Sequence, residues 1–319
     1  YSSAASDVYK RQLFVMAGCS GHSKNLKFGA ADIGGVYYSF ASTFTQLADK
    51  EIDGYTFETK TTAGSVANLR LISDGYIDLA IAQADLLSDA YNATGTFADK
   101  KYQKGYKAVA SLYTECCQIV VRKDSGITGI DDLINKTVSV GASESGSEKN
   151  AEQILKMSGI TDELINKVNM DYTEAAEKLK AGEIDAFFCT AGTRTEVIGQ
   201  LSKECDICLI SLDDKCIDKM LSAYSLCEKY TIPAGTYNGQ DSDVTTIGVK
   251  AVLIAKQSLS DDVIKNVTKT IYEHADDFKY ATSLDISFDI NTAADGVDIP
   301  FHSGAAAYYT ERGINVLTE

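Results

Sequence analysis

Apolar residues along the chain follow two alternating patterns, one typical of buried strands and the other of amphipathic helices. Leu26–Ala30 and Ile77–Ala82 are short apolar runs of the kind that forms buried strands. Between them, Val36–Lys50 places apolar residues three and four positions apart, as expected for a helix with one buried face. Because the two patterns continue to alternate, the sequence predicts an α/β fold with mostly parallel sheets.

The same patterns define the other predicted elements. Strands are expected at Tyr55–Thr59, Tyr106–Tyr113, Gln118–Arg122, Thr137–Val140, Lys167–Met170, Ala186–Ala191, Ile207–Ser211 and Val244–Ala255. Helices are expected at Gly64–Ser73, Gln83–Tyr91, Thr173–Ala181, Glu196–Leu201, Asp214–Ser222, Ser260–Phe278 and Ala305–Arg312, with Thr173 as the N-cap of its helix. A further helix is expected after the loop Gly141–Ser147 and ends at Met157.

The alternating series occurs twice, which predicts two similar lobes with a ligand cleft between them. Residues 26–115 together with 250–319 are expected to form lobe 1, and residues 116–249 lobe 2. Two crossing strands near 115–122 and 245–255 are expected to act as the hinge.

Glycine- and hydroxyl-rich loops follow several predicted strands, at residues 31–37, 61–65, 83–85, 141–147 and 191–194. Ligands of open α/β sheets bind beyond the carboxyl ends of the strands, so these loops should meet in the cleft. Gly35 and Val36 open one helix, and Thr62, Gly64 and Ser65 precede or open another. Free N–H groups in a first helical turn attract a carboxylate, so the pattern predicts a site for a small anion.

The overall charge narrows the choice of partners. The formal net charge of −15 argues against nucleic-acid binding, which needs a basic surface to displace counterions. It also argues against broad adhesion to anionic lipid. It does not exclude a small anionic ligand, because helix N-termini hold anions without any net positive charge.

Residues for catalysis or cofactor binding do not gather in the candidate loops. The histidines are His22, His274 and His302, and none lies in those loops. Gly141–Ser147 lacks the Lys-Ser or Lys-Thr of a phosphate-binding loop, and no dinucleotide fingerprint is present. The pairs Asp131-Asp132, Asp213-Asp214 and Asp261-Asp262 lie at or near predicted helix starts, where carboxylates favour the helix dipole. We therefore expect neither enzymatic activity nor a cofactor.

The N-terminal segment indicates a lipid anchor. Lys10-Arg11 precedes the apolar run Leu13–Gly18, and Cys19 follows it. This order resembles the lipobox of a bacterial lipoprotein signal, which implies lipidation of Cys19 and an extracytoplasmic protein. Residues 1–25 are accordingly interpreted as a truncated lipoprotein signal and tether.

Seven further cysteines are present: Cys116, Cys117, Cys189, Cys205, Cys208, Cys216 and Cys227. Cys205 and Cys208 have the spacing of one half of a zinc site, but the second close pair is missing, so no metal site is expected. Whether two of the cysteines form a disulfide stays open.

Segments through nearly the whole chain after the tether resemble one family. They are Gly34–Tyr38, Thr62–Leu71, Asp78–Asp85, Ala90–Asn92, Gly141–Ala151, Asp185–Gly192, Thr231–Tyr237, Thr246–Val249 and Ile299–Ala305. In these segments the chain is similar to the TAXI receptors, which serve tripartite ATP-independent periplasmic (TRAP) transporters. The resemblance implies a type II periplasmic-binding-protein-like fold, with two α/β lobes joined by two hinge strands.

The resemblance also implies a function: capture of a glutamate- or glutamine-like amino acid or a four- or five-carbon dicarboxylate, and its delivery to TRAP transporter subunits in the membrane. The loops and the family's cleft motifs together give the expected ligand-binding residues Gly35, Val36, Tyr37, Thr62, Gly64, Ser65, Asn68, Gln83, Asp85, Ser145, Ser147, Ala191 and Gly192. Asn68 could instead brace its loop, and Asp85 could cap the helix that follows Ala84. We expect a monomer.

Two departures and two rival functions stay open. Ser143-Glu144 stands where the family often has Pro-Gly, which affects the path of that loop, and Arg194 lies beside the last candidate loop. A sensory receptor would show the same sequence features as a transport receptor. An enzyme on the same fold would need a serine or cysteine beside a histidine in the cleft.

Overall fold

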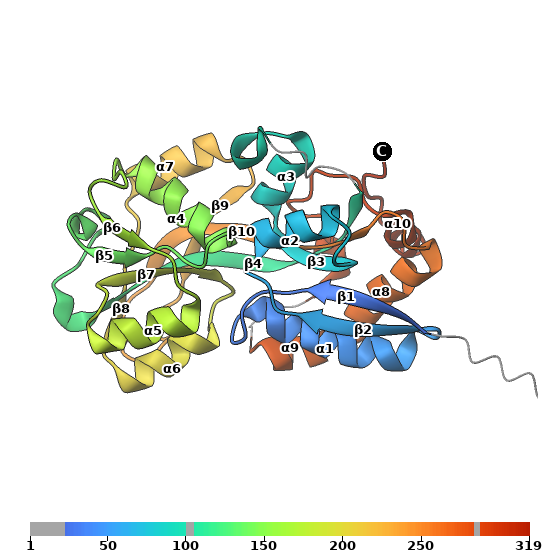
Figure 1. Cartoon of the computed structure of the whole chain (residues 1–319), viewed down its shortest axis with the longest axis horizontal. Helices are drawn as coiled ribbons and strands as arrows, with labels where there is room; N and C mark the ends of the chain where they lie inside the picture. The colour runs from blue at the N-terminus through green and yellow to red at the C-terminus, as the bar shows by residue number, and fades with distance from the viewer. Residues whose placement is uncertain (1–22, 100–104, 284–287) are drawn as a thin grey trace, which may run out of the picture.

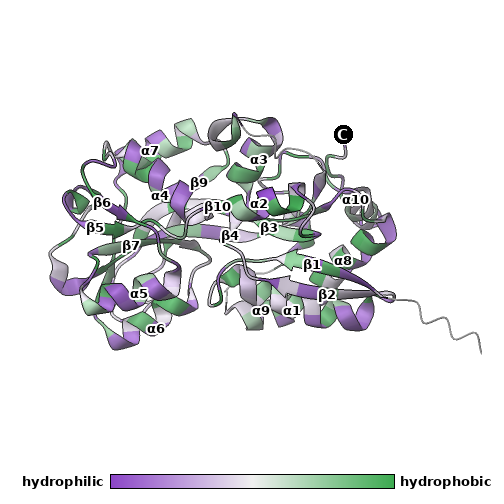
Figure 2. Ribbon diagram, in the orientation of Figure 1, coloured by the Kyte–Doolittle hydropathy of each residue, from purple (hydrophilic) through white to green (hydrophobic). Residues whose placement is uncertain are grey.

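The computed structural model describes residues 23–99, 105–283 and 288–319. In these residues ten strands form one connected sheet in the order β2-β1-β3-β10-β4-β7-β5-β6, with β8 on β4 and β9 on β10. Helices cover both faces of each half of the sheet (Figure 1). Apolar residues concentrate in the strands and on the inner helix faces (Figure 2).

The first half of the molecule contains three parallel strands and most of the N- and C-terminal helices. Its strands are β1 (Lys24–Gly29), β2 (Tyr55–Lys60) and β3 (Leu79–Gln83). Its helices are α1 (Val36–Glu51), α2 (Ser65–Ser73), α3 (Ala84–Asn92), α8 (Asp261–Glu273), α9 (Ala275–Thr282) and α10 (Ser303–Thr310), with short 3₁₀ turns at Gly95–Phe97 and Ile290–Thr292. Aromatic packing joins helices from both ends of the chain, because Phe40 of α1 stacks on Phe278 of α9 with ring centroids 4.4 Å apart.

The second half repeats this plan with the middle of the chain. Its strands are β5 (Thr137–Ser139), β6 (Asn166–Val168), β7 (Ala186–Ala191), β8 (Ile207–Leu209) and β9 (Cys227–Ile232). Its helices are α4 (Gly146–Met157), α5 (Tyr172–Ala181), α6 (Glu196–Glu204) and α7 (Asp214–Ala223), with 3₁₀ turns at Lys123–Ser125 and Ile130–Leu133. A separate apolar core that includes Ile119, Val138, Ile154 and Phe188 fills this half.

Two long antiparallel strands, β4 (Tyr106–Arg122) and β10 (Val244–Lys256), run from one half into the other (Figure 1). β10 pairs with β3 in the first half and with β9 in the second. β4 pairs with β7 and β8 of the second half through its last residues. The lobe boundaries that the sequence predicts, at residues 115 and 249, fall inside these two strands, and the division into two lobes stays a prediction.

The structure differs from the predicted elements in four places. The two extended runs around Cys116 and Cys117 form the single strand β4, and β9 was not predicted. The helix predicted from Ser260 through Phe278 ends at Glu273, because the backbone of His274 leaves helical geometry, and α9 begins after it. The prediction of Thr173 as N-cap is wrong: Asp171 caps α5, and its carboxylate accepts a hydrogen bond from Glu174 N over 2.8 Å.

Among the described residues, no helix is both long enough and apolar enough to cross a membrane. Residues 1–22 of the predicted signal and tether, Cys19 and His22 among them, lie outside the described residues. The prediction that the tether reaches residue 25 is wrong, because Lys24 and Asn25 already pair with β2 as the first residues of β1.

Candidate functional site

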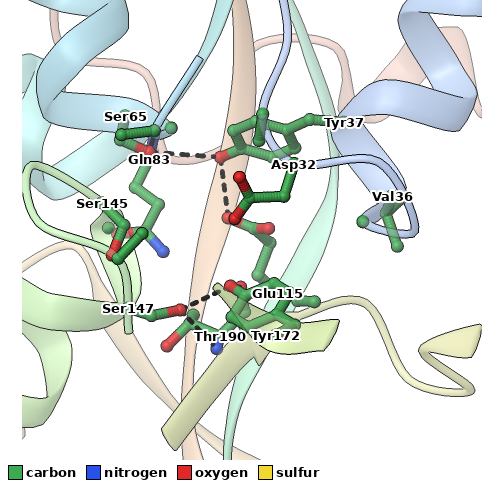
Figure 3. A pocket seen from close by; sticks show the side chains of 17 residues that line it. Asp32, Val36, Tyr37, Ser65, Gln83, Glu115, Ser145, Ser147, Tyr172 and Thr190 are labelled. Carbon is green, nitrogen blue, oxygen red and sulfur yellow. Dashed lines mark hydrogen bonds between the residues drawn. The ribbon is translucent and has the colours of Figure 1, made fainter. Parts of the chain in front are cut away.

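One pocket gathers loops from both halves of the molecule (Figure 3). Of the residues expected from the sequence, it is lined by Gly35, Val36, Tyr37, Gly64, Ser65, Gln83, Ser145, Ser147 and Ala191. Its other lining residues are Ala31, Asp32, Ala63, Glu115, Ala142, Gly146, Tyr172 and Thr190. The convergence of the candidate loops on a shared cavity agrees with the prediction of a cleft; that these residues bind a ligand stays a proposal.

Four helices present their N-termini to this pocket, because each begins at the carboxyl end of a strand in the sheet. The N-caps are Gly35 for α1, Gly64 for α2, Gln83 for α3 and Ser145 for α4. In α1, α2 and α3 no N-cap side chain accepts a hydrogen bond from the first turn. Backbone N–H groups and the positive ends of the helix dipoles therefore make this region favourable for negative charge.

The pocket has two walls, one from each half of the molecule, and hydroxyl groups on both walls are fixed by hydrogen bonds. On the first wall, Ser65 Oγ accepts a hydrogen bond from Gln83 N over 3.1 Å. On the facing wall, Ser147 Oγ accepts one from Thr190 N over 2.8 Å and lies 2.5 Å from the Tyr172 hydroxyl. Gln83 Oε1 is buried without a hydrogen-bond partner among the described residues, so it is available to a polar ligand.

Glu115 is the most unusual group in the pocket. Its side chain lies on β4 between the two walls, is 3% exposed, and accepts a hydrogen bond from the Tyr37 hydroxyl over 2.8 Å (Figure 3). Burial raises the pKa of Glu115 to about 8, against the opposing effect of hydrogen bonds from Tyr37 and Gln83. At neutral pH this carboxyl group therefore mostly keeps its proton.

Asp32 supplies a second carboxyl group, which points into the same space as Glu115 (Figure 3). Burial, and secondarily the charge of Asp171, raise the pKa of Asp32 to about 6. Asp32 is thus mostly ionised at pH 7. The described residues that line the pocket include no lysine, arginine or histidine, so neither carboxyl group has a cationic partner there. The pocket combines helix N-termini, which favour an anionic group, with a carboxylate that favours a cationic one.

The cavity is small. The space open to the centre of a water-sized sphere is about 30 Å³, which is room for roughly two or three water molecules. This enclosed space is smaller than an amino acid.

Four of the expected site residues do not line the pocket. Asn68 is fully buried and braces the first wall: its Nδ2 donates to Ala30 O over 2.6 Å and to Ile81 O over 2.8 Å. Thr62 Oγ1 lies 2.8 Å from Asn68 Oδ1 and 3.0 Å from Ala30 O, so it belongs to the same brace. Gly192 O accepts a hydrogen bond from Thr195 Oγ1 over 2.7 Å.

Asp85, the fourth, lies in the first turn of α3, where burial raises its pKa to about 6. Arg194 is exposed, with a φ of 68°, and is not part of the pocket wall.

Sequence reasoning missed Glu115, Asp32, Tyr172 and Thr190. A signal for Glu115 was present, because it is an isolated acid in the middle of the apolar run from Tyr106 to Arg122. Asp32 lies in a loop that was named for its glycines.

Neither a cluster of metal-ligating side chains nor a disulfide is found among the described residues. Within residues 23–99, 105–283 and 288–319, no group of three or more His, Cys, Asp or Glu could hold a metal ion. The seven cysteines after Cys19 are all free thiols, which answers the open question of a disulfide among them.

Comparison with known proteins identifies a matching family and several solved structures with a similar fold. A model of the NMT1-like family matches residues 28–313. PhnD1 from Prochlorococcus marinus in complex with methylphosphonate has a TM-score of 0.59 at 12% identity, covering 83% of this chain and 93% of that chain. A putative L-cystine ABC transporter protein from Listeria monocytogenes has a TM-score of 0.52 at 13% identity, covering 82% and 94%. An ancestral arginine-binding protein bound to arginine has a TM-score of 0.50 at 15% identity, covering 82% and 98%. This likeness confirms the mixed α/β fold of periplasmic binding proteins that the sequence predicted.

The brace made by Asn68 can be tested by stability. Asn68→Ala removes the amide donor from the carbonyl group of Ile81 and from that of Ala30, which keeps the hydrogen bond from Thr62 Oγ1, so the free energy of unfolding should fall by about 1–3 kcal/mol. Urea unfolding followed by circular dichroism measures the change. Asn92→Ala is the control, because the exposed Asn92 side chain bonds only within its own helix turn. Equal effects of the two substitutions would contradict the bracing role.

The protonation of Glu115 predicts a pH-dependent difference between the wild-type protein and Glu115→Gln. Between the ordinary pKa of 4.5 and the folded value of about 8, the unfolded state ionises Glu115 while the folded state keeps its proton. The wild type should therefore lose stability relative to the variant as pH rises through this window, with no further change above it.

Urea unfolding at several pH values measures this difference. The control is Glu58→Gln. The wild type should not lose stability relative to this variant as pH rises, because Lys60 and Asn25 lower the pKa of the exposed Glu58. A difference between wild type and Glu115→Gln that is constant from pH 4.5 to 8 would rule out a buried, protonated Glu115.

Proposed function

The chain belongs to the NMT1-like family, and from this membership and the chemistry of the pocket we propose that it is an extracytoplasmic solute-binding protein for a small amino acid or carboxylate. The observation that carries the proposal is the pocket itself. Helix N-termini from both halves of the molecule surround it together with two acidic side chains, without a lysine, arginine or histidine among the described lining residues.

Among small acids, this arrangement fits a zwitterion best. The ligand carboxylate would lie against the first turns of α1, α2 and α4, with hydroxyls of Ser65, Ser145 and Ser147 in reach. Its ammonium group would face Asp32 and Glu115. Hydrogen bonds to charged groups contribute about 1.5–3 kcal/mol each. Three or four of them, offset by closure and desolvation, are consistent with roughly micromolar affinity.

Capture would work by closure of two lobes around the ligand. The cavity of about 30 Å³ is too small to admit an amino acid without opening. β4 and β10 connect the two halves, so bending of this strand pair is the simplest opening motion. On closing, exclusion of water would strengthen each hydrogen bond to the ligand.

The finer assignment rests on the resemblance to TAXI receptors. We propose a glutamate- or glutamine-like ligand, delivery to TRAP transporter subunits, and anchoring through a lipid on Cys19. The similar solved structures named for arginine, L-cystine and methylphosphonate have small polar solutes in common. A signalling partner in place of a transporter is the main rival, and the genes beside this one would decide it: large apolar transporter subunits favour transport.

Ligand binding is tested directly with purified protein. L-glutamate and L-glutamine should raise the melting temperature and bind with roughly micromolar affinity in isothermal titration calorimetry. Succinate and 2-oxoglutarate should bind more weakly, because a dicarboxylate places negative charge beside Asp32 without a cation to offset it. Asp32→Asn should weaken binding of the amino acids and not that of the dicarboxylates. If none of these acids binds, the proposal is wrong.

The close approach of the two walls gives a second test. A Cβ on Gly146 of α4 would lie 2.3 Å from Oε1 of the buried Gln83 side chain on the facing wall. Gly146→Ala should therefore displace the Gln83 side chain or hold the walls apart, and either change should weaken glutamate binding roughly tenfold. Gly199→Ala on α6 is the matched control, because no atom lies within 4 Å of its added Cβ. Calorimetry that finds wild-type affinity in both variants would show that the walls do not need this contact.

A further inference from the structure

Arg70 and Glu144 form an ion pair between the two halves of the molecule. Arg70 lies on α2 of the first half, and Glu144 lies in the loop before α4 of the second. The pair is bidentate: Arg70 Nη2 lies 2.6 Å from Glu144 Oε2, and Nε lies 3.2 Å from Oε1. A backbone hydrogen bond runs beside it, from Ala67 N to Glu144 O over 3.1 Å. One residue of the second half thus makes three hydrogen bonds to one helix of the first.

The loop that carries Glu144 is held firmly to its own half. Glu144 N donates to Glu148 Oε2 over 3.0 Å, and Ser145 Oγ caps α4 by accepting from Glu148 N over 3.0 Å. Asn169 Nδ2 donates to Gly141 O and to Glu148 Oε1, each over 2.9 Å. Because both ends of the loop are fixed, a contact made by Glu144 acts on the whole second half and not on a flexible loop alone.

The backbone of Glu144 adds a second observation. Its φ of 66° lies in the left-handed region, where a residue with a side chain is disfavoured by about 1–2 kcal/mol and glycine is not. A glycine would satisfy the backbone at this position. The glutamate side chain, in contrast, reaches Arg70 across the boundary between the halves.

The contact lies beside the pocket. A Cβ on Gly64, the N-cap of α2, would lie 3.6 Å from Cα of Ser145, the N-cap of α4. The two helix N-termini are therefore in van der Waals range, with Arg70 in the second turn of α2. Any separation of the pocket walls at this point must break the ion pair and the bond from Ala67.

From these contacts we infer that Arg70 and Glu144 are positioning residues that bias the molecule toward the closed arrangement of α2 and α4 before any ligand binds. The inference rests on the two-lobed clamp proposed above and adds a named pair that sets its resting equilibrium. The side chains are 32% and 41% exposed, so water and salt screen the attraction. The ion pair raises the ratio of closed to open forms by roughly two- to fivefold, which leaves both forms accessible.

Hydrogen exchange at one amide reports this equilibrium without a ligand. Ala67 N has the carbonyl of Glu144, in the other half, as its acceptor, whereas Asn68 N bonds to Gly64 O inside α2 over 2.8 Å. NMR-detected exchange of Ala67 therefore follows opening between the halves, and exchange of Asn68 follows fraying of the helix. In Arg70→Met and in Glu144→Gln, exchange of Ala67 should accelerate roughly two- to fivefold while that of Asn68 is unchanged.

Three comparisons separate a positioning role from a merely structural one. The double variant should exchange no faster than either single variant, because both remove the same interaction. Raising the NaCl concentration to about 1 M should accelerate Ala67 exchange in the wild type and not in Glu144→Gln. Glu144→Gly should accelerate it as well, yet leave the melting temperature equal or higher, because glycine relieves the left-handed backbone.

The inference is overturned if the effects of Arg70→Met and Glu144→Gln on exchange are additive, or if Ala67 exchanges as an unprotected amide in the wild type. Neither result bears on the proposed binding function, because calorimetry with glutamate tests that function separately. Conversely, if no acid binds but exchange of Ala67 responds as described, the closure bias stands and the proposed ligand class falls.

Discussion

The antiparallel pairing of β4 with β10 is the contact on which the rest of the molecule depends. These two strands form the middle of the sheet. β10 pairs with β3 of the first half and β4 pairs with β7 of the second, so the pair joins the strands of the two halves into one sheet. The pairing also fixes where the site lies. Glu115 sits in β4 opposite Val249 of β10, at the level where the strand ends of the two halves face each other. A pocket between the halves follows from this crossing.

The electrostatics of that pocket come from the backbone and from burial. Helix N-termini provide positive potential without any charged side chain, which allows a protein of net charge −15 to offer a site for an anionic group. Burial keeps Glu115 neutral at a position where an ionised carboxylate would oppose that potential. Asp32, which is less buried than Glu115, mostly keeps its charge at neutral pH. The two acids differ in role because their surroundings differ.

Much of this could be predicted from the sequence, because strand ends and glycine-rich helix starts are local features. The pattern that identified Gly35, Gly64 and Ser145 needed only the order of elements and the rule that ligands bind beyond strand ends. Glu115 could not be assigned in this way, since its role depends on the register of β4 against β7 and β10, which is a property of the folded sheet. Asn68 illustrates the converse, because the sequence left open whether it contacts a ligand or braces its loop, and only its hydrogen bonds to Ala30 and Ile81 reveal the brace.

The N-cap of α5 shows the limit of local signals as well. Asp171 and Thr173 are both good capping residues, and only the backbone path between β6 and α5 distinguishes them. β9 was missed because its exposed and buried residues follow no strict alternation, and its pairing with β10 decides its conformation.

The side chain of Asn68 has a consequence for the kinetics of ligand capture. By bonding to carbonyl groups beyond β1 and within β3, and by contacting Thr62 after β2, it ties three strand ends into one unit. The wall that carries Tyr37, Ser65 and Gln83 is then preorganised, and a solute bound as proposed would meet half of its contacts already in place. Encounter with this wall costs little conformational entropy, so the association rate should be governed by diffusion to the open form. The residence time of the bound solute would depend instead on how often the wall from the second half moves away from this one.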